Sequence, residues 1–330
     1  MKKSLICILS FLLVANVCSA AKKNGWKEDG VKGKVKERFE VEHHNRNDVN
    51  QITKESVSKY DENGNKIEWE WVEYMGSWHS KFKIVYKYDD RGNNIEGIGY
   101  NADGSLSKKT VLKYDEKDNV IEEAGYKSDG ALDSKSIFKY NYDDRGNNIE
   151  RTEYNAEGAL KRKDIYKYDD KGNWVEWTET KADGTIKNIE RYKRDDKRNL
   201  IEREDCRADG TVFEKWIFNY DDKGNNIEIA VWTPDGTKKW KHISKYNDEG
   251  KIFLDTYYNA DGSISSKDIH KYDDMGNQNE WVKHNADGSI NWKRKFKYDA
   301  NGNMLEEALY AVRNGKETLN EITSFSYTYY

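Results

Sequence analysis

A tyrosine-containing motif recurs along most of the chain at a nearly constant spacing. The motif is Lys-Tyr-Asp-x-x-Gly-Asn, and successive tyrosine positions are 28, 26, 28 and then six times 26 residues apart. A fixed period of this length indicates a repeat protein, in which each unit packs only against its neighbours. The ten positions are Tyr60, Tyr88, Tyr114, Tyr142, Tyr168, Arg194 (the one exception), Tyr220, Tyr246, Tyr272 and Tyr298.

A second glycine-containing motif, Asn-Ala-Asp-Gly-Ser or a variant, lies between successive tyrosines, from Gly104 to Gly288. Asp-Gly and Asn-Gly between β-rich runs are strong hairpin signals, because such turns need a residue with positive φ. Each unit is therefore predicted to be strand, turn, strand, turn. In two units Asp118 and Arg198 replace the glycine that follows the tyrosine. Asp tolerates positive φ better than Arg does, so Arg198 is the predicted weak point.

The parity of the period favours strands over helices. The period is even, and so are the two-residue insertions before Tyr88 and before Tyr142. Side chains alternate between the faces of a strand, so an even spacing keeps each column of residues on one face. Only 36% of residues are hydrophobic and 35% are charged, which excludes a thick aliphatic core. We predict an all-β fold: a repetitive antiparallel β-meander of about twenty strands, coiled by sheet twist as a solenoid, spiral or open barrel.

Charged and apolar columns accompany the tyrosines. Lys precedes the tyrosine position in eight of ten units, an apolar residue usually follows seven positions later, and Glu follows eight positions later in nine. A two-residue turn would place Lys87 opposite Glu96 and Tyr88 opposite Ile95, whereas a three-residue loop would place Lys87 opposite Ile95. We favour the first register, because it pairs opposite charges across strands. It predicts one face with the tyrosine and apolar columns, and another with Lys and Glu ladders.

Four segments are expected along the chain. Residues 1–20 resemble a signal peptide: Lys2 and Lys3 precede a short apolar stretch and a small-residue cleavage site after Ala20. An alternative interpretation makes Cys18 a lipid-anchored residue. The chain is accordingly expected to be secreted, periplasmic or on the cell surface, with no membrane span. The other segments are an N-terminal lead-in and cap at 21–58, a ten-unit repeat domain at 59–315, and a C-terminal half unit and cap at 316–330.

The repeated Tyr-Asp followed by Gly, as in residues 88–93, resembles the YD repeats of Rhs-type proteins. The resemblance covers about residues 55–315. It implies a strand-rich spiral, a secreted or surface location, and carbohydrate binding or the enclosure of a toxin. The period here is longer, and Asn replaces the usual Arg or Lys after glycine. The chain is also distantly similar to MORN-like hairpin repeats.

Most chemically suggestive residues have a simpler structural explanation. The Asp that follows the tyrosine position in nine of ten units suggests calcium ligands, and the Glu ladder suggests catalytic carboxylates. Near-identical copies in nine units instead favour turn capping and ladder pairing. The six histidines lack metal-ligand spacing, and Cys206 has no evident histidine partner. We therefore expect no catalytic residue, no metal and no cofactor, and a protein that is not an enzyme. A formal net charge of −4 gives no reason to expect nucleic acid as a partner.

Tryptophans are the best candidates for ligand contacts. Exposed aromatic rings stack on sugars and are enriched at interfaces. The alternative is that they only fill the faces of a thin sheet. The predicted function is an exported, non-enzymatic β-repeat protein that presents an extended surface for glycan or protein binding, and the alternative is a purely structural envelope or shell component. The predicted ligand-binding residues are Trp69, Trp71, Trp177 and Trp281.

Overall fold

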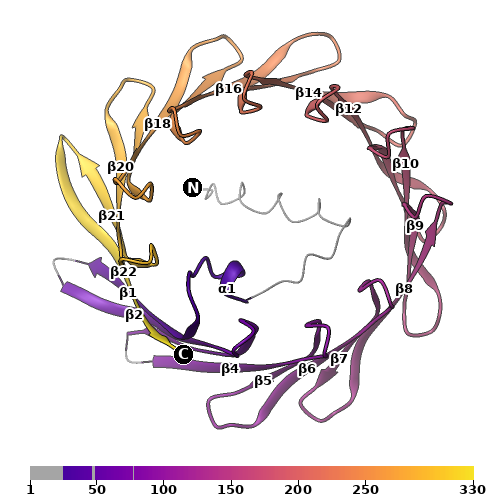
Figure 1. Cartoon of the computed structure of the whole chain (residues 1–330), viewed down its shortest axis with the longest axis horizontal. Helices are drawn as coiled ribbons and strands as arrows, with labels where there is room; N and C mark the ends of the chain where they lie inside the picture. The colour runs from indigo at the N-terminus through magenta and orange to yellow at the C-terminus, as the bar shows by residue number, and fades with distance from the viewer. Residues whose placement is uncertain (1–24, 47–48, 77) are drawn as a thin grey trace.

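The described part of the chain forms one closed antiparallel sheet. The computed structural model describes residues 25–46, 49–76 and 78–330, which contain a single 22-stranded sheet. Consecutive strands pair with each other, and β1 (Val35–Arg46) also pairs with β22 (Lys316–Tyr329), so that the sheet closes into a barrel (Figure 1). The predicted all-β meander is confirmed, and among the coiled forms left open the structure has a closed ring. The predicted signal peptide at 1–20, with Cys18, lies outside the described residues.

A short helix and twenty further strands make up the rest of the described structure. One four-residue helix, α1 (Gly25–Glu28), precedes the strands, and no helix among the described residues is long and apolar enough to cross a bilayer. The strands between the two closing ones are β2 (Val49–Tyr60), β3 (Lys66–Met75), β4 (Trp78–Tyr88), β5 (Asn94–Tyr100), β6 (Leu106–Tyr114), β7 (Val120–Lys127), β8 (Leu132–Tyr142), β9 (Asn148–Tyr154), β10 (Leu160–Tyr168), β11 (Trp174–Lys181), β12 (Ile186–Arg194), β13 (Leu200–Cys206), β14 (Val212–Tyr220), β15 (Asn226–Trp232), β16 (Lys238–Tyr246), β17 (Ile252–Asn259), β18 (Ile264–Tyr272), β19 (Gln278–Asn285), β20 (Ile290–Tyr298) and β21 (Met304–Arg313).

The turn after the tyrosine position is a three-residue loop capped by its Asp, or by Asn247 in one unit. In the turn between β4 and β5, the Gly92 N–H donates to the Asp89 carbonyl (2.9 Å) and the Asp89 N–H to the Asn93 carbonyl (3.0 Å). Asp89 Oδ1 also accepts the backbone N–H groups of Arg91 and Asn93, at 3.0 and 2.8 Å. Gly92 has a φ of 84°, which only glycine adopts without strain. The structure thus gives the Asp column its predicted role in turn capping.

Cross-strand pairing keeps the predicted charge ladder but changes the tyrosine register. Lys87 lies opposite Glu96, as predicted, whereas Tyr88 lies opposite Asn94 because the register shifts between Lys87 and Tyr88. The prediction that Tyr88 faces Ile95 is therefore wrong. The three-residue loop displaces the register by one residue, and a bulge at the start of the next strand restores it.

The bulge also changes where the apolar column lies. We expected these residues to pack on the tyrosine face, but at the bulge they lie beside the Lys and Glu side chains and stay in contact with water. Five members are 36–40% exposed: Ile67, Ile149, Ile201, Phe253 and Leu305.

In most units a tyrosine hydroxyl bonds to a backbone carbonyl of the preceding unit. Tyr114 Oη donates to the Asn94 carbonyl at 2.8 Å. The same bond, over the same 20-residue separation, joins Tyr168 to Asn148 (2.9 Å), and Tyr272 donates likewise to Ile252 (2.7 Å). A net contribution of about 1 kcal/mol per bond is typical. The tyrosine column therefore provides a neighbour-to-neighbour contact that needs no thick core.

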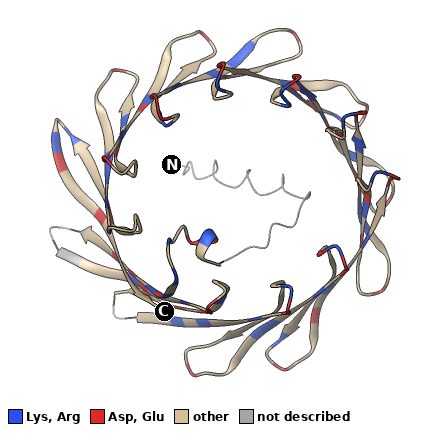
Figure 2. Cartoon of the chain, viewed as in Figure 1, with Lys and Arg blue, Asp and Glu red and all other residues tan. Residues whose placement is uncertain are grey.

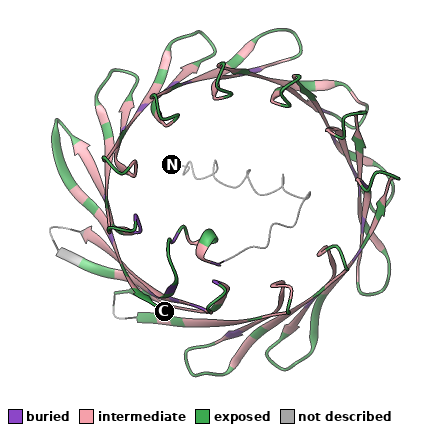
Figure 3. Ribbon diagram, in the orientation of Figure 1, coloured by how far each residue is buried: buried purple, intermediate pink, exposed green. Residues whose placement is uncertain are grey.

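The clearest apolar core lies where the N-terminal segment covers the wall. Val31, Val35 and Tyr60 are buried together, with Trp26 and Tyr327 packed against them. Elsewhere most of the wall is half-buried and the exposed residues gather in the turns (Figure 3). Segment 25–34 lies on the inner side of the ring (Figure 1).

Both residues that replace a turn glycine adopt positive φ, as the repeat requires: 63° at Asp118 and 68° at Arg198. The Asp118 carboxylate gains contacts in that position, with Arg91 Nη1 at 2.9 Å and Asn93 Nδ2 at 2.8 Å. Arg198 also has a strained backbone, and its side chain is exposed to solvent.

Replacing Arg198 by glycine should stabilise the ring. Relief of the positive-φ strain is expected to raise the free energy of unfolding by about 1 kcal/mol. The matched control is Gly172→Ala, in the same turn of the preceding unit. Gly172 has a φ of 77°, and an added Cβ would meet no atom within 4 Å, so only backbone strain changes and stability should fall by a similar amount. Urea unfolding measures both; no difference between the two variants would contradict the strain assignment.

Candidate functional site

The tyrosine face of the sheet is the inner face of the ring. Helix α1 and the residues after it lie inside the ring (Figure 1). There Asp29 accepts a hydrogen bond from Tyr60 Oη. The same carboxylate forms an ion pair with Lys66 Nζ at 2.8 Å. Tyr60 therefore faces inward, and by strand alternation so do the other tyrosines of the column and the residues two and four positions before them.

The outer face carries the Lys and Glu ladders, in which one Glu bridges two cations. Glu68 Oε1 lies 2.8 Å from Lys59 Nζ, and its Oε2 lies 2.6 Å from Lys83 Nζ. Glu96, Glu122 and Glu202 are each bridged by two lysines in the same way. Charged residues of both signs occur all around the ring (Figure 2). Regular pairing along the ladder gives the Glu column a structural role, as the sequence indicated.

The inner face differs from the outer one because its residues change from unit to unit. We define the inner belt as the positions four and two before each tyrosine position and nine after it. Paired strands place these positions opposite one another, as Trp177 lies opposite Tyr166 and Glu190. The positions four before are Ser56, Ile84, Thr110, Phe138, Asp164, Glu190, Trp216, His242, Asp268 and Arg294. The positions two before are Ser58, Tyr86, Leu112, Tyr140, Tyr166, Tyr192, Phe218, Ser244, His270 and Phe296. The positions nine after are Trp69, Gly97, Glu123, Arg151, Trp177, Arg203, Ile229, Asp255, Trp281 and Glu307.

Three of the predicted ligand-binding tryptophans, Trp69, Trp177 and Trp281, are in the inner belt, and Trp71 lies two residues further along the same face. Trp69 stacks on Trp71 with ring centroids 4.2 Å apart, and Trp71 stacks on Phe82 at 5.2 Å. All four are half-buried, so part of each ring stays accessible. They lie on β3, β11 and β19, at different places around the ring, and so form no single pocket (Figure 1).

Two other tryptophan pairs extend the aromatic surface of the inner face. Trp281 meets Trp292 edge to face at 4.8 Å, and Trp216 meets Trp240 in the same way at 5.3 Å. Trp232 is different: it lies opposite Lys215 on the outer face, where Lys238 Nζ lies 5.1 Å from its ring centroid. Trp232 is thus a tryptophan of the same repeat that does not belong to the inner belt.

Asp164 combines an aromatic neighbour with charge. The Trp177 indole N–H donates to Asp164 Oδ1 at 3.2 Å, while Arg151 and Arg162 lie 3.3 and 3.4 Å from Oδ2. The carboxyl is only 2% exposed. Burial raises its pKa above the ordinary value, against the opposing effect of the two arginines. The indole, the carboxylate and the guanidinium groups form one preorganised polar and aromatic surface.

A histidine network on β16–β18 was not predicted from the sequence. Asp255 Oδ1 lies 2.7 Å from His242 Nε2 and accepts from Ser244 Oγ at 2.6 Å, and Oδ2 lies 3.3 Å from His270 Nε2. Burial alone would raise the pKa of Asp255, but these three partners outweigh it and hold the pKa well below its ordinary value. A signal was present: Ser244 and His270 stand where most units have an aromatic residue two positions before the tyrosine.

Asp268 lies directly opposite Asp255, and its pKa is shifted in the opposite direction. The two residues are cross-strand partners on β17 and β18. Burial raises the pKa of Asp268, and its nearest cation, Lys283 Nζ, is 3.7 Å from Oδ1. Two carboxyls that face each other across neighbouring strands therefore have pKa values shifted in opposite directions.

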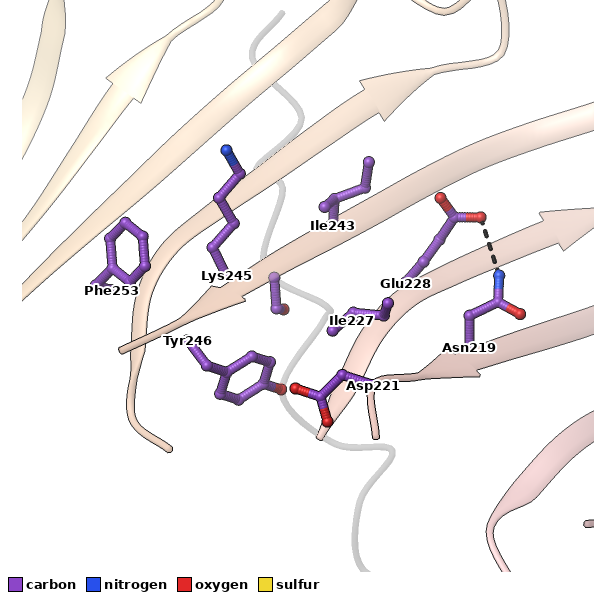
Figure 4. A pocket seen from close by; sticks show the side chains of 9 residues that line it. Asn219, Asp221, Ile227, Glu228, Ile243, Lys245, Tyr246 and Phe253 are labelled. Atoms are coloured by element: carbon purple, nitrogen blue, oxygen red, sulfur yellow. Dashed lines mark hydrogen bonds between the residues drawn. The ribbon is translucent and has the colours of Figure 1, made fainter. Parts of the chain in front are cut away.

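Hollows on the outer side follow from the repeat itself. One of about 510 Å³ is lined by Ile227, Glu228, Ile243, Lys245 and Phe253, among others (Figure 4). A second hollow, of about 450 Å³, lies on β4–β6. Its lining includes Lys87, Ile95, Glu96, Val111 and Lys113, which belong to the same repeat columns. Because the same residue types recur in both, neither hollow has the features of a dedicated site.

No family model and no curated protein sequence matches the chain. Among solved structures, a complex of TcdB2–TccC3 with Cdc42 is similar at 13% identity and a TM-score of 0.36, over 85% of this chain and 17% of that one. TcdB2–TccC3 itself gives 13% identity and a TM-score of 0.35, over 83% and 18%. A porin-like protein from Bacteroides uniformis gives 9% identity and a TM-score of 0.31, over 88% and 97%. The YD-repeat resemblance thus remains a prediction from the repeat motif.

The two facing aspartates should respond differently to neutralisation. Asp255→Asn is expected to lower the free energy of unfolding at pH 7 by about 2 kcal/mol, because it removes charge-assisted hydrogen bonds. Asp268→Asn removes a poorly compensated buried charge, so stability should stay unchanged or rise.

The pH dependence of unfolding gives a second measure of this pair. The depressed pKa of Asp255 stabilises the fold above the ordinary pKa of about 4, and that contribution is lost as the pH falls further. Asp255→Asn should therefore flatten the acid side of the stability profile. For Asp268 the pKa is raised, so protonation on lowering the pH favours the folded state, and Asp268→Asn should remove that gain. Identical profiles for both variants would contradict the assignment.

Proposed function

We propose that this chain is an exported, non-enzymatic β-repeat ring whose inner belt binds a glycan. The observation that carries the proposal is the contrast between the two faces of one sheet. The Lys and Glu columns outside are nearly constant in every unit, whereas the inner belt changes at each unit between indole, carboxylate, guanidinium and imidazole. Structural pairing explains a constant column, but unit-specific residues in the same backbone setting favour recognition.

The chemistry of the inner belt suits sugars. Half-exposed indole rings can stack on the C–H faces of pyranose rings, while fixed carboxylates and arginines bond hydroxyl groups. At Trp177 and Asp164 both kinds of group are in direct contact (3.2 Å). At Trp216 the indole donates to Asp205 (3.2 Å), and the Arg203 guanidinium lies 5.8 Å from the ring centroid. In each pair the carboxylate fixes the indole as a stacking face, and the part-exposed guanidinium groups beside it, Arg162 and Arg203, can donate to sugar hydroxyls.

The width of the ring indicates how a glycan would bind. A circumference of 22 strands at about 4.8 Å per strand gives a backbone diameter of roughly 34 Å or more, since strand tilt widens it. A single oligosaccharide is much narrower than this opening. The ligand would therefore run along the wall and contact several units of the inner belt, which adds weak contacts into useful affinity.

Export and the absence of catalysis belong to the same proposal. The basic start and apolar stretch of residues 1–20 support passage through a secretory pathway. Cys206 is the one cysteine after residues 1–20, and its thiol is buried. Burial protects an unpaired thiol from oxidation, which suits an oxidising compartment. Asp255 engages fixed partners with both of its oxygens, an arrangement that orients side chains rather than one that frees a nucleophile.

A glycan array tests the proposal. The wild-type chain should bind a subset of extended neutral or acidic glycans, and Trp177→Ala and Trp281→Ala should each weaken binding about tenfold, the loss of roughly 1.4 kcal/mol of stacking. The matched control is Trp232→Ala on the outer face, which should change affinity less than twofold.

Four results would contradict it. Absence of any glycan signal from the wild-type chain would favour a purely structural shell component. An equal loss of affinity in Trp232→Ala would move the contact surface away from the inner belt. Shortened glycan products after incubation with the protein would show catalysis, and an intact N-terminus on protein recovered outside the cytoplasm would contradict cleavage of residues 1–20.

A further inference from the structure

The ring has one seam that no hairpin joins. Every other pair of neighbouring strands is consecutive in the sequence, whereas β1 and β22 come from opposite ends of the chain. Closing this seam brings together residues separated by nearly the whole sequence. The contacts that hold it therefore decide whether the sheet is a ring or an open strip with two edges.

Near one end of the seam, the segment after α1 supplies those contacts. The buried side chain of Asn303 accepts the Lys32 N–H and donates to the Lys32 carbonyl, the latter at 3.0 Å. The Tyr330 N–H donates to the Lys34 carbonyl at 3.0 Å. These bonds link the N-terminal segment to the last turn and the last strand.

At the other end, a histidine and two glutamates meet across the seam. His44 on β1 lies directly opposite Glu321 on β22, and Glu42 lies two residues before His44 on the same face. His44 Nε2 is 3.2 Å from Glu42 Oε1 and 3.0 Å from Glu321 Oε2. The three potential ligand atoms lie within 4.8 Å of one another.

This arrangement has more negative charge than one imidazole can satisfy. A single Nε2–H donates well to one acceptor, yet two carboxylates converge on it, and like charges at this range repel. A divalent cation between the three groups would neutralise both carboxylates. It would take one nitrogen and two oxygen ligands at about 2.0–2.2 Å, a donor set that suits Zn²⁺ and its transition-metal neighbours.

The surroundings support a metal site. Thr53 Oγ1 donates to Glu42 Oε1 at 3.0 Å, the kind of outer contact that orients a ligating carboxylate. The His44, Glu42 and Glu321 side chains are 33%, 27% and 34% exposed, so an ion can enter from water and keep water in its remaining positions.

We propose that Glu42, His44 and Glu321 bind one divalent transition-metal ion of the Zn²⁺ class, which links β1 to β22 and fastens the seam at the end away from α1. The ion binds the closed ring and not the opened strip, because Glu321 reaches His44 only when the seam is paired. Metal binding therefore stabilises the closed form by mass action. This inference does not depend on glycan binding.

Zinc titration of the full chain tests the proposal. After dialysis against chelator, the protein should bind one Zn²⁺ per chain by calorimetry, and its melting temperature should rise with Zn²⁺ but not with the same concentration of Mg²⁺. Co²⁺ in place of Zn²⁺ should give a visible d–d absorption band, which reports the ligands independently of stability.

Matched variants separate this site from other histidines. His44→Gln and Glu321→Gln should each lose the bound ion and the Co²⁺ band. His43→Gln, one residue away on the opposite face, should keep both, with circular dichroism confirming that each variant is folded. No stoichiometric binding, equal stabilisation by Mg²⁺, or a Co²⁺ band that survives in His44→Gln and Glu321→Gln would each overturn the proposal.

Discussion

The geometry of one turn determines the pairing register of the whole ring. The Asp-capped loop holds a residue at positive φ and shifts the pairing by one position, and the bulge after it shifts the pairing back. The two changes cancel, so that Lys87 still meets Glu96. Because the period is even, this correction repeats in every unit without exchanging the faces. Every inward or outward assignment in the ring depends on that cancellation.

A wall one sheet thick then has to be stable without a deep core. Stability comes from contacts between neighbouring units: tyrosine hydroxyls bonded to carbonyls inside, and Glu residues bridged by two cations outside. Exposed ion pairs contribute little individually, typically about 0–1 kcal/mol, so their value lies in repetition and in fixing the register. Closure between β1 and β22 removes the two free edges that a strip of this length would expose. The high charge content is thus compatible with a single ordered sheet.

The sequence was informative about whatever repeats and uninformative about whatever occurs once. The meander, the capping Asp and the Lys87–Glu96 pairing could be predicted from periodicity, since each belongs to a column that recurs from unit to unit. The Tyr88–Asn94 pairing was missed because two compensating irregularities leave the outer columns unchanged. Ring closure depends on accumulated twist over the whole sheet, which no local pattern encodes. The Asp255 network was missed because we compared the units by what they share, whereas Ser244 and His270 are visible only as departures from the column.

Departures from a repeat have a specific physical meaning in such a wall. A residue in a constant column is explained by its partners in the neighbouring units, so its identity says little about a ligand. A charged group in the inner belt, such as Asp164 or Asp268, carries a desolvation penalty that the fold alone does not require, since other units place Ile84 or Thr110 at the same position. Polar groups retained against such a penalty are typical of functional surfaces. The outer ladder fixes the register, and that leaves the inner belt free to differ at each unit.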